Sequence, residues 1–330
     1  MKKTTRITAA LCTAFAASVA ALASGPASAQ EYPSRPMRLV IPFAAGGTTD
    51  STGRLIAAGL STRLGQQVVV ENRPGAGSQI GMEYVARAVP DGYTLAFGGS
   101  DGLVVLPAVK KKAPYDSVKE FTPVAIVANA PLSFTINAKV PANNLREFIA
   151  YAKSKPGAVR YGSAGVGTTL HLGIEHLQAL AGLDMIHVPY KGGLPMMTDV
   201  VAGEVELVLT SADFAKRFAD TGQLRVLAQA DNRRHPLLPN VPTTADAGMP
   251  DVKAVSWFGI FGPAGMPRTV VDRIAKELPS LLEDKTLIDR LILVGAYTRF
   301  VPANEIPKII TDEIAHWSKL VRDAKIPLQD

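Results

Sequence analysis

Short apolar runs typical of β-strands alternate with helix-like segments along almost the whole chain. This alternation constrains the fold more than any other feature of the sequence. Early examples are the apolar run 38–43, the helical spacing of 50–64, the run 67–72 and the helical pattern of 78–89. Strands that alternate with helices usually build a parallel sheet covered by helices. The pattern therefore predicts an α/β fold in which each domain is a mainly parallel sheet flanked by helices.

The length of the chain, 330 residues, is enough for two domains of ordinary size. Residues 131–230 contain one complete α/β module, whereas residues 231–330 contain too few strands for another. We therefore expect a discontinuous first domain, built from 30–130 plus 231–330, and a second domain from 131–230. In this arrangement two or three strands cross between the domains. Three small consecutive domains are the alternative.

Residues 1–29 have the pattern of a secretory signal peptide. Lys2, Lys3 and Arg6 precede an alanine-rich apolar stretch, and Ala27-Ser28-Ala29 fits a small-residue cleavage site. A membrane anchor is the alternative, but hydroxyl residues interrupt the apolar stretch and it is short. We expect this segment to be removed when the protein is exported.

The rest of the sequence excludes several classes of chemistry. Cys12, the only cysteine, lies in the expected signal peptide, so residues 30–330 have no disulfide or thiol chemistry. Three of the six net positive charges also lie in residues 1–29, which leaves about +3. The basic run at 110–112 is too short to favour a nucleic-acid partner, and no later apolar stretch has the length of a membrane span.

Two strand-to-helix turns rich in glycine and hydroxyl residues are candidate ligand sites. They contain Gly46, Gly47, Thr48, Thr49 and Asp50, and then Ser163, Gly165, Gly167, Thr168 and Thr169. A helix start carries unpaired N–H groups and about half a positive charge, and glycine lets a ligand approach them. The turns therefore predict a carboxylate or phosphate site, with simple backbone turning as the alternative. Neither turn has the Gly-Lys-Ser/Thr sequence of a nucleotide-binding P-loop.

Signals for catalysis or metal binding are weaker. Gly98-Gly99-Ser100-Asp101-Gly102 fits the serine-hydrolase turn, but Pro107 interrupts the segment that follows and no oxyanion motif precedes it. We therefore expect Ser100 to line a pocket, with a serine hydrolase as the alternative function. His171 and His176 are five residues apart and point to different sides of a helix, so no metal site is expected. No cofactor is expected either.

Several other candidates keep two interpretations. Asp50 and Asp213 stand near helix starts, where they could cap the helix or contact a ligand. His171 lies in the first turn after the second glycine turn, where it could reach a ligand or pack in the core. Phe43 and Tyr190 stand beside the turns and are candidate ligand contacts.

Several stretches resemble, in the same order, the Bug-type solute receptors of tripartite tricarboxylate transporters. They include YPSRPMRLVIPFAAGGTTD, VVVENRPGAGSQIGMEYVARAVPDGYTL, YGSAGVGTTLHL and HVPYKGGLPMMTDVVAGEVEL. The resemblance implies a two-domain periplasmic-binding-protein-like (type II-like) fold that closes a cleft on its ligand. It also implies a monomeric periplasmic receptor, not an enzyme, for a small di- or tricarboxylate or aromatic acid, with membrane permease subunits as partners.

Carried onto this chain, the resemblance points to ligand-binding residues in both domains. In the first domain they are Phe43, Ala45, Thr48, Thr49, Asp50 and Ser100. In the second they are Ser163, Ala164, Gly165, Thr168, Thr169 and His171. Tyr190 and Asp213 are further candidates, and Asp213 lies in a stretch where the family varies. A sensory adaptor with a signalling partner is another possible function, and the sequence does not identify the carboxylate.

Overall fold

The computed structural model describes residues 31–330. Arg35–Asp330 form one compact unit, and residues 31–34 belong to a separate unit, Met1–Ser34. The expected signal peptide, with Cys12, lies outside the described residues. Within 31–330, none of the helices is both long enough and apolar enough to cross a membrane.

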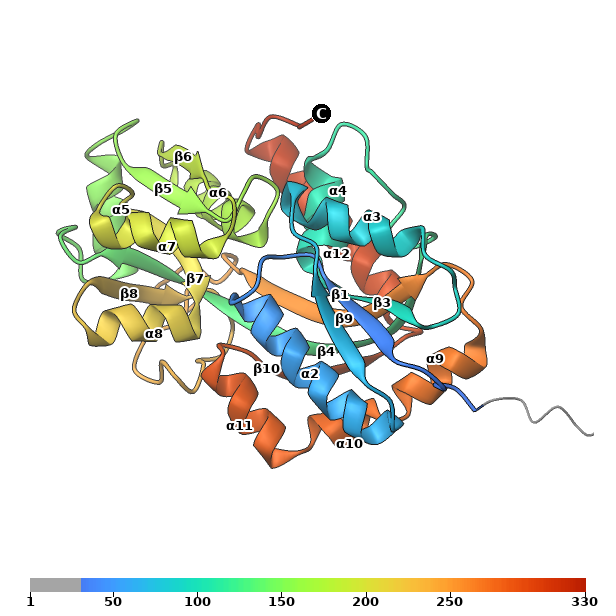
Figure 1. Ribbon diagram of the computed structural model, residues 1–330. Helices are drawn as coiled ribbons and strands as arrows, with labels where there is room; N and C mark the ends of the chain where they lie inside the picture. Colours follow the sequence, from blue (N-terminus) through green and yellow to red (C-terminus); the bar gives the residue numbers. More distant parts are fainter. Residues whose placement is uncertain (1–30) are drawn as a thin grey trace, which may run out of the picture. The chain divides into compact units, whose positions relative to one another are not determined.

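The described residues form a ten-stranded sheet at the centre of Arg35–Asp330 (Figure 1). The strands are β1 (Met37–Ile41), β2 (Val68–Asn72), β3 (Thr94–Gly99), β4 (Phe121–Asn137), β5 (Arg160–Ser163), β6 (Ile186–Pro189), β7 (Leu207–Ser211), β8 (Leu224–Gln229), β9 (Val255–Pro263) and β10 (Tyr297–Pro302). Their order is β2-β1-β3-β9-β4-β7-β5-β6, and β8 and β10 also pair with β4.

The long strand β4 divides this sheet into two portions. Residues 121–131 pair with β9 and β10, and residues 132–137 pair with β7 and β8. The first sheet portion therefore contains β1, β2, β3, β9, β10 and residues 121–131. The second sheet portion contains β5, β6, β7, β8 and residues 132–137. Pro131 lies where the partner changes, and its missing N–H suits a break in the hydrogen-bond ladder.

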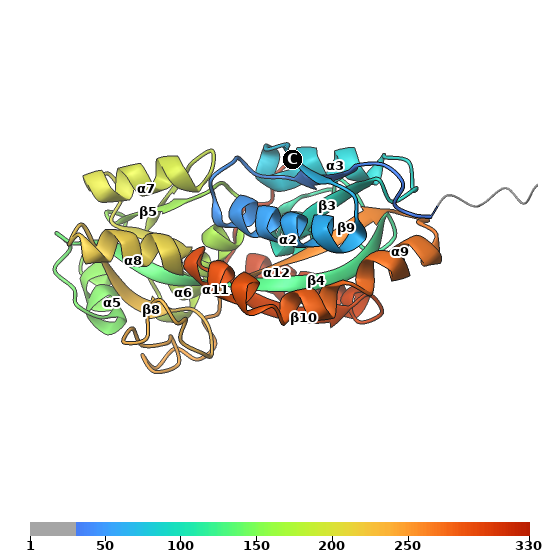
Figure 2. The same cartoon turned by 60° about the horizontal axis from the view of Figure 1, so that its bottom comes forward.

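Helices pack around both sheet portions (Figure 2). They are α2 (Thr48–Leu64), α3 (Gln79–Ala86), α4 (Leu106–Val109), α5 (Leu145–Lys153), α6 (Thr169–Ala181), α7 (Gly193–Ala202), α8 (Ala212–Asp220), α9 (Arg268–Ala275), α10 (Leu278–Leu282), α11 (Lys285–Leu293) and α12 (Ile306–Asp323), with a 3₁₀ turn η1 (Ala76–Ser78) and a π-helix η2 (Asp101–Val105). The connections from β1 to β2 and from β2 to β3 run in opposite directions across the sheet, so right-handed crossovers place α2 and α3 on opposite faces.

The apolar core follows these layers. In the first sheet portion, residues of α3, η2 and α12 pack with Trp257 and Phe261 of β9. In the second, α5 and α6 pack on one side around Phe134, and α7 packs on the other around Val208. Each portion is thus covered by helices on both faces, as an α/β fold requires.

Glycine and polar residues explain where two site-forming helices begin and end. Both α2 and α6 stop at a glycine in the left-handed conformation, Gly65 at φ 67° and Gly182 at φ 62°. The start of α6 is capped by the Thr168 side chain, which accepts from the N–H of His171. By contrast, no side chain caps the start of α2 after Gly47.

The α/β fold is confirmed, but the sheet is mixed, so the expectation of mainly parallel sheets was wrong. β1 is parallel to β2 and β3, and β5 is parallel to β6 and β7. In contrast, β4 runs antiparallel to β7, β8, β9 and β10, and β3 runs antiparallel to β9. The sequence pattern conceals this because the first part of β4 carries no clear strand signal. Residues 121–131 are mostly buried and contain bulges, so they show no regular alternation.

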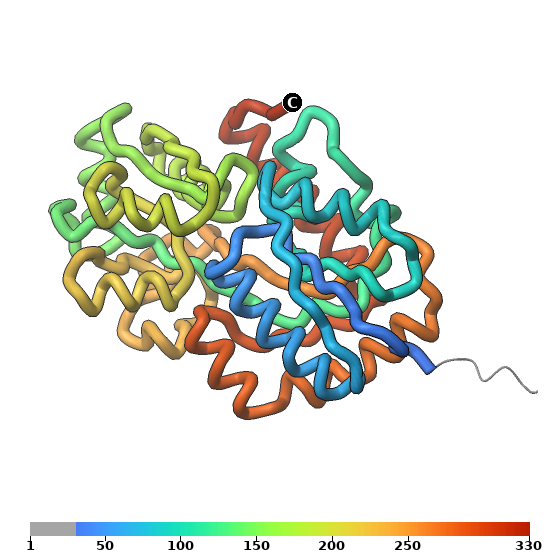
Figure 3. Tube along the Cα trace, in the orientation of Figure 1, coloured from blue at the N-terminus to red at the C-terminus, as the bar shows by residue number. Residues whose placement is uncertain are grey.

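The C-terminal segment returns to the first sheet portion (Figure 3). β9 inserts between β3 and β4, and β10 pairs with β4. The helices α9 and α10 lie between β9 and β10 in the chain. The domain boundaries near residues 130 and 230 stay a prediction.

Candidate functional site

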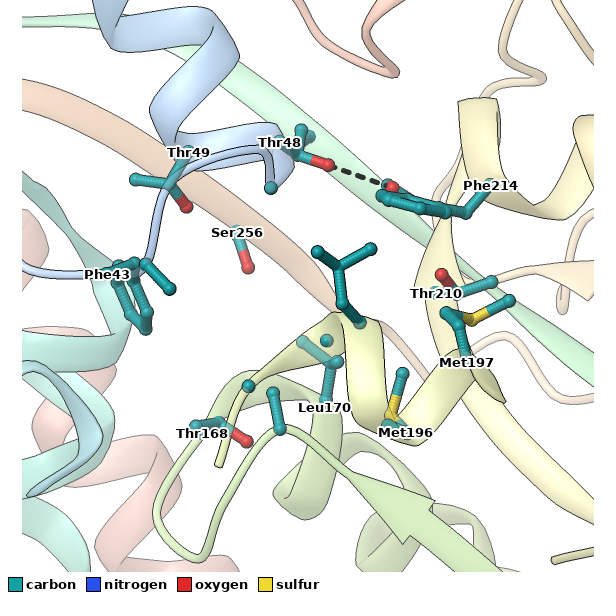
Figure 4. A pocket seen from close by; sticks show the side chains of 18 of the residues that line it. Phe43, Thr48, Thr49, Thr168, Leu170, Met196, Met197, Thr210, Phe214 and Ser256 are labelled. Atoms are coloured by element: carbon teal, nitrogen blue, oxygen red, sulfur yellow. Dashed lines mark hydrogen bonds between the residues drawn. The ribbon is translucent and has the colours of Figure 1, made fainter. Parts of the chain in front are cut away.

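Five strand-to-helix turns surround one cavity of about 250 Å³ (Figure 4). They connect β1 to α2, β3 to η2, β5 to α6, β6 to α7, and β7 to α8, and each contributes lining residues. β4 and β9 complete the wall between the two sheet portions. In α/β sheets, ligands bind outside the carboxyl ends of the strands, which is where this cavity lies.

The first glycine turn leaves its helix start open to the cavity. Gly47, Thr48 and Thr49 line the cavity, and no side chain caps α2. The first N–H groups of a helix have no intrahelical acceptor. This turn therefore offers backbone donors and the positive end of a 17-residue helix to an anion.

Asp50 supports this turn from behind and does not line the cavity. Its carboxylate accepts hydrogen bonds from the N–H of Gly46 at 3.0 Å, from Arg54 at 2.9 Å and from Asn72 at 2.8 Å. Burial opposes ionisation of Asp50, but these hydrogen bonds outweigh it and lower the pKa of the carboxyl. Asp50 thus holds the loop in shape, but it neither caps α2 nor lines the cavity.

The second glycine turn differs because other groups of the chain already hydrogen-bond to the start of its helix, α6. The N–H and the hydroxyl of Thr169 both donate to Oδ1 of Asp101, each at 2.7 Å. Thr168 caps the same helix. Burial raises the pKa of Asp101, and the hydrogen bonds from Thr169 offset this only in part. The two turns are therefore not equivalent, and the first is the more open to a ligand.

A buried cluster lies behind the second turn. The rings of His171 and His187 stack with centroids 4.1 Å apart, and Tyr161 stacks on His187. Ser163 Oγ lies 2.7 Å from Nε2 of His187. Burial lowers the pKa of His171 to about 3, with a further effect from His187, and lowers that of His187 to about 4. Ser163 and His171 are buried here and do not line the cavity.

A third glycine turn, which the sequence reasoning did not select, also lines the cavity. Gly192 precedes α7 and Gly193 begins it, the helix start is likewise uncapped, and the lining continues through Met197. A glycine pair between a strand and a helix was the available signal. Tyr190 stands beside this turn but lies off the cavity, where its hydroxyl donates to Asp199 at 2.8 Å.

A hydrogen bond crosses the cavity between the two sheet portions. The hydroxyl of Thr48 donates to Oγ of Ser211 at 2.9 Å, drawn as a dashed line in Figure 4. Ser211 in turn donates to Oδ1 of Asp213 at 2.5 Å. Asp213 does not line the cavity, and its carboxylate packs against Gly295, where a side chain would overlap it. Asp213 therefore positions Ser211.

Three hydroxyl groups on the cavity wall have no hydrogen-bond partner among the described residues. They belong to Thr49, Thr210 and Ser256, which point into the cavity in Figure 4. Thr210 and Ser256 are only 3% and 5% exposed. Their hydroxyls face the open space of the cavity, where a ligand or ordered water can hydrogen-bond to them. Ser256 lies inside the apolar strand β9, where no sequence signal marks it.

The serine-hydrolase pattern has a structural explanation. Ser100 does not line the cavity, and its Oγ accepts from the N–H of Trp257 at 3.4 Å. A side chain on Gly99 would overlap the backbone of Trp257, so this glycine permits close pairing of β3 with β9. No histidine hydrogen-bonds Ser100 in the described part of the chain. Nor do residues 31–330 contain a cluster of His, Cys, Asp or Glu that could hold a metal ion.

The structure thus places part of the predicted site at the cavity, together with residues that were not predicted. Predicted residues that line the cavity are Phe43, Ala45, Thr48, Thr49, Ala164 and Thr168. Those that do not are Asp50, Ser100, Ser163, Gly165, Thr169, His171, Tyr190 and Asp213. Further lining residues missed by the sequence reasoning include Leu132, Leu170, Lys191, Leu194, Met196, Met197, Thr210, Ser211, Phe214, Ser256 and Phe258.

This fold, with a cavity at the strand ends, is that of periplasmic solute-binding proteins. The solved structure of periplasmic binding protein BugD matches it with a TM-score of 0.83 at 31% identity, over 90% of this chain and 100% of that one. The structure of R. palustris Rpa4515 with adipate matches it with a TM-score of 0.85 at 33% identity, over 90% of this chain and 99% of that one.

Sequence comparison identifies the family. The family described as "Tripartite tricarboxylate transporter family receptor" matches residues 52–326. The "UPF0065 protein in tcbD-tcbE intergenic region" of Pseudomonas sp. (strain P51) is 35% identical over 300 residues, which cover 89% of this chain and 88% of that protein. The chain therefore belongs to the tripartite tricarboxylate transporter receptors, as its resemblance to Bug-type receptors indicated. This is a family of periplasmic solute-binding receptors.

Proposed function

We propose that this protein binds a small organic carboxylate in the cavity and delivers it to permease subunits of a tripartite tricarboxylate transporter. The observation that carries the proposal is the uncapped start of α2 on a cavity wall that also presents the hydroxyls of Thr210 and Ser256, which have no partner among the described residues. Such hydroxyls can hydrogen-bond to a polar ligand, and the positive end of the helix favours an anionic ligand. A relative in the same family was solved with adipate, a carboxylate.

The carboxylate is best placed at the start of α2. There it can accept from the N–H groups of Thr48 and Thr49 and from the hydroxyls of Thr49 and Ser256. No arginine of residues 31–330 lines the cavity, so binding relies on backbone N–H groups, hydroxyls and water in place of an arginine fork.

Closure of the cavity is the proposed mechanism of signalling to the permease. The two portions are joined by β4 and are held across the cavity by the contacts Thr48–Ser211 and Asp101–Thr169. A ligand that contacts both portions stabilises the closed form by its difference in affinity for the two states. A micromolar acid would supply roughly −8 kcal/mol of binding free energy.

A calorimetric screen of mono-, di- and tricarboxylates and aromatic acids tests the proposal. At least one acid should bind, and the double variant Thr49→Val/Ser256→Ala should bind it much more weakly while keeping its circular dichroism spectrum. Saturable binding of sugars or cations, with no acid bound, would contradict the proposal.

The transport role and the periplasmic location need a test in cells. Deletion of the gene should reduce uptake of the acid that the purified protein binds, and the protein should be recovered from the periplasm without residues 1–29. Normal uptake, combined with loss of a transcriptional response to the acid, would indicate a sensory adaptor.

A further inference from the structure

The start of α6 differs from the start of α2 in one respect, because a carboxylate of the chain itself lies on it. The N–H and the hydroxyl of Thr169 both donate to Oδ1 of Asp101 at 2.7 Å. Asp101 begins η2, which follows β3 of the first sheet portion, whereas α6 follows β5 of the second. This contact therefore joins the two sheet portions and satisfies the helix start at the same time.

Close packing encloses the contact between Asp101 and Thr169. Their residues are only 8% and 1% exposed. A Cβ atom on Gly167 would lie 2.7 Å from Cγ2 of Val109 in α4, and Leu172 of α6 belongs to the same apolar core as η2 and α4. The second glycine turn thus packs tightly against η2 and α4. A ligand can bind the N–H of Thr169 only if it displaces the carboxylate of Asp101.

Asp101 supplies to α6 the kind of group that an anionic ligand would supply to α2. A helix start attracts negative charge, and hydrogen bonds to a carboxylate are stronger than those between neutral groups. At α6, the N–H of Thr169 has Asp101 as its acceptor and the N–H of His171 has the side chain of Thr168. At α2, no side chain accepts from the first turn.

We propose that Asp101 is an internal anion that occupies the start of α6 and thereby restricts a ligand carboxylate, on this side of the cavity, to the start of α2. The second half of this statement rests on the function proposed above, whereas the occupation of α6 does not. The restriction concerns the start of α6 alone, since Lys191 and the uncapped start of α7 also line the cavity and can contact other groups of the ligand. Asp101 is thus a residue that determines specificity by filling an anion site.

Rescue by formate tests whether the start of α6 is an anion site. Asp101→Ala keeps Cβ and removes a group of the size of formate, and Asp101 lines the cavity, so formate can reach the space. The variant should be less stable, because Thr169 loses its acceptor. In urea unfolding at constant ionic strength, its free energy of unfolding should rise with formate concentration, with a slope that corresponds to one more bound anion than in the unaltered protein. Asp101→Asn fills the same space and should show no such extra rise.

Asp284→Ala is the matched control for the loss of a helix-start carboxylate. Asp284 caps α11, lies off the cavity and is exposed, so its removal leaves no enclosed site and formate should have no extra effect. If Asp101→Ala does not fold, Asp101→Ser leaves nearly the same space and takes its place. Equal formate dependence in the Asp101 variant and the unaltered protein, or an equal extra rise in Asp101→Asn, would overturn the inference.

A crystal structure of the unaltered protein with benzoate tests the restriction on the ligand. The benzoate carboxylate should lie at the start of α2, with Asp101 still on Thr169. A benzoate carboxylate on the N–H of Thr169, with Asp101 displaced, would overturn the restriction. If formate rescues Asp101→Ala but no organic acid binds in the cavity, the proposed function fails and the assignment of Asp101 to the start of α6 stands.

Discussion

At the scale of single residues, the hydroxyl of Ser256 is the sharpest marker of the site. The residue is only 5% exposed, and its hydroxyl faces the cavity without a partner among the described residues. A hydrogen bond to a charged ligand contributes about 1.5–3 kcal/mol. Ser256→Ala should therefore weaken carboxylate binding roughly ten- to hundredfold, measured by calorimetry, with little change in the free energy of unfolding.

Thr52 provides a matched control for that experiment. Its hydroxyl also has no partner among the described residues, but it is fully buried in α2 and lies away from the cavity. Thr52→Val keeps the shape and removes the unsatisfied hydroxyl, so it should leave binding unchanged and stability equal or slightly higher. Equal effects of the two substitutions on binding would show that Ser256 has no direct contact with the ligand.

The stacked histidines behind the second turn make a separate prediction about pH. Burial lowers the pKa of His171 to about 3 and of His187 to about 4, from an ordinary value of 6.5. Below about pH 6.5 the unfolded chain therefore binds protons that the folded protein excludes. The free energy of unfolding contributed by this pair is complete above pH 6.5 and is lost as the pH falls towards 4.

Urea unfolding between pH 7 and pH 4 measures this contribution. His187→Asn should be less stable at pH 7 but should lose less stability on acidification than the unaltered protein, by up to about 1.4 kcal/mol per pH unit. Parallel pH profiles for the two proteins would contradict the assignment.

At the scale of secondary-structure elements, a substitution at the uncapped start of α2 should have opposite effects on ligand binding and on stability. Gly47 has an ordinary backbone conformation, and a side chain there would meet no other atom within 4 Å. Gly47→Ser should therefore fold, and its hydroxyl can accept from the free N–H groups that a ligand would use. We expect stability to rise by a few tenths of a kcal/mol and carboxylate binding to weaken.

The comparison for Gly47→Ser is a helix cap outside the cavity. Asp284 caps α11 by accepting from the N–H of Leu287. Asp284→Ala should lower the free energy of unfolding by about 1 kcal/mol and leave binding unchanged. If Gly47→Ser binds the acid normally, the start of α2 is not the carboxylate site.

Helices and turns were predictable from the sequence where neighbouring residues in the chain determine them. The glycine turn at Gly47 and the helix α6 after Thr168 follow from hydroxyl and glycine residues beside apolar runs. The first part of β4 was missed, because a strand buried on both faces and broken by bulges has no alternation to detect. The role of Asp101 was also missed, since its partner Thr169 lies 68 residues further along the chain.

Residue-level site predictions were limited for the same reason. Thr49 stands in a recognisable turn and lines the cavity, whereas Ser256 stands inside a strand and reaches the cavity only through the pairing of β9 with β4. His171, although adjacent to a predicted turn, points into the core. Sequence reasoning located the turns but not the side of each turn that faces the ligand.

At the scale of the whole molecule, closure around the ligand predicts that an acid brings Thr48 and Ser211 together. Their hydroxyl oxygens are 2.9 Å apart, and residues 31–330 contain no cysteine. The double variant Thr48→Cys/Ser211→Cys should form a disulfide under mild oxidation, and a bound acid should accelerate this reaction several-fold. Mass spectrometry after alkylation measures the rate, and each single variant is the control. An acid that binds without changing the rate would contradict closure at this contact.

The central claim is that a carboxylate lies at the start of α2, inside the cavity that α7 and α8 also line. The most direct measurement is a crystal structure of the protein with 4-bromobenzoate, in which anomalous scattering locates the bromine. We predict one bromine peak beside Met196, Met197 and Phe214, with the carboxylate at the N–H groups of Thr48 and Thr49. A bromine peak outside this cavity, or one at the start of α2 with the carboxylate among the methionines, would contradict the account.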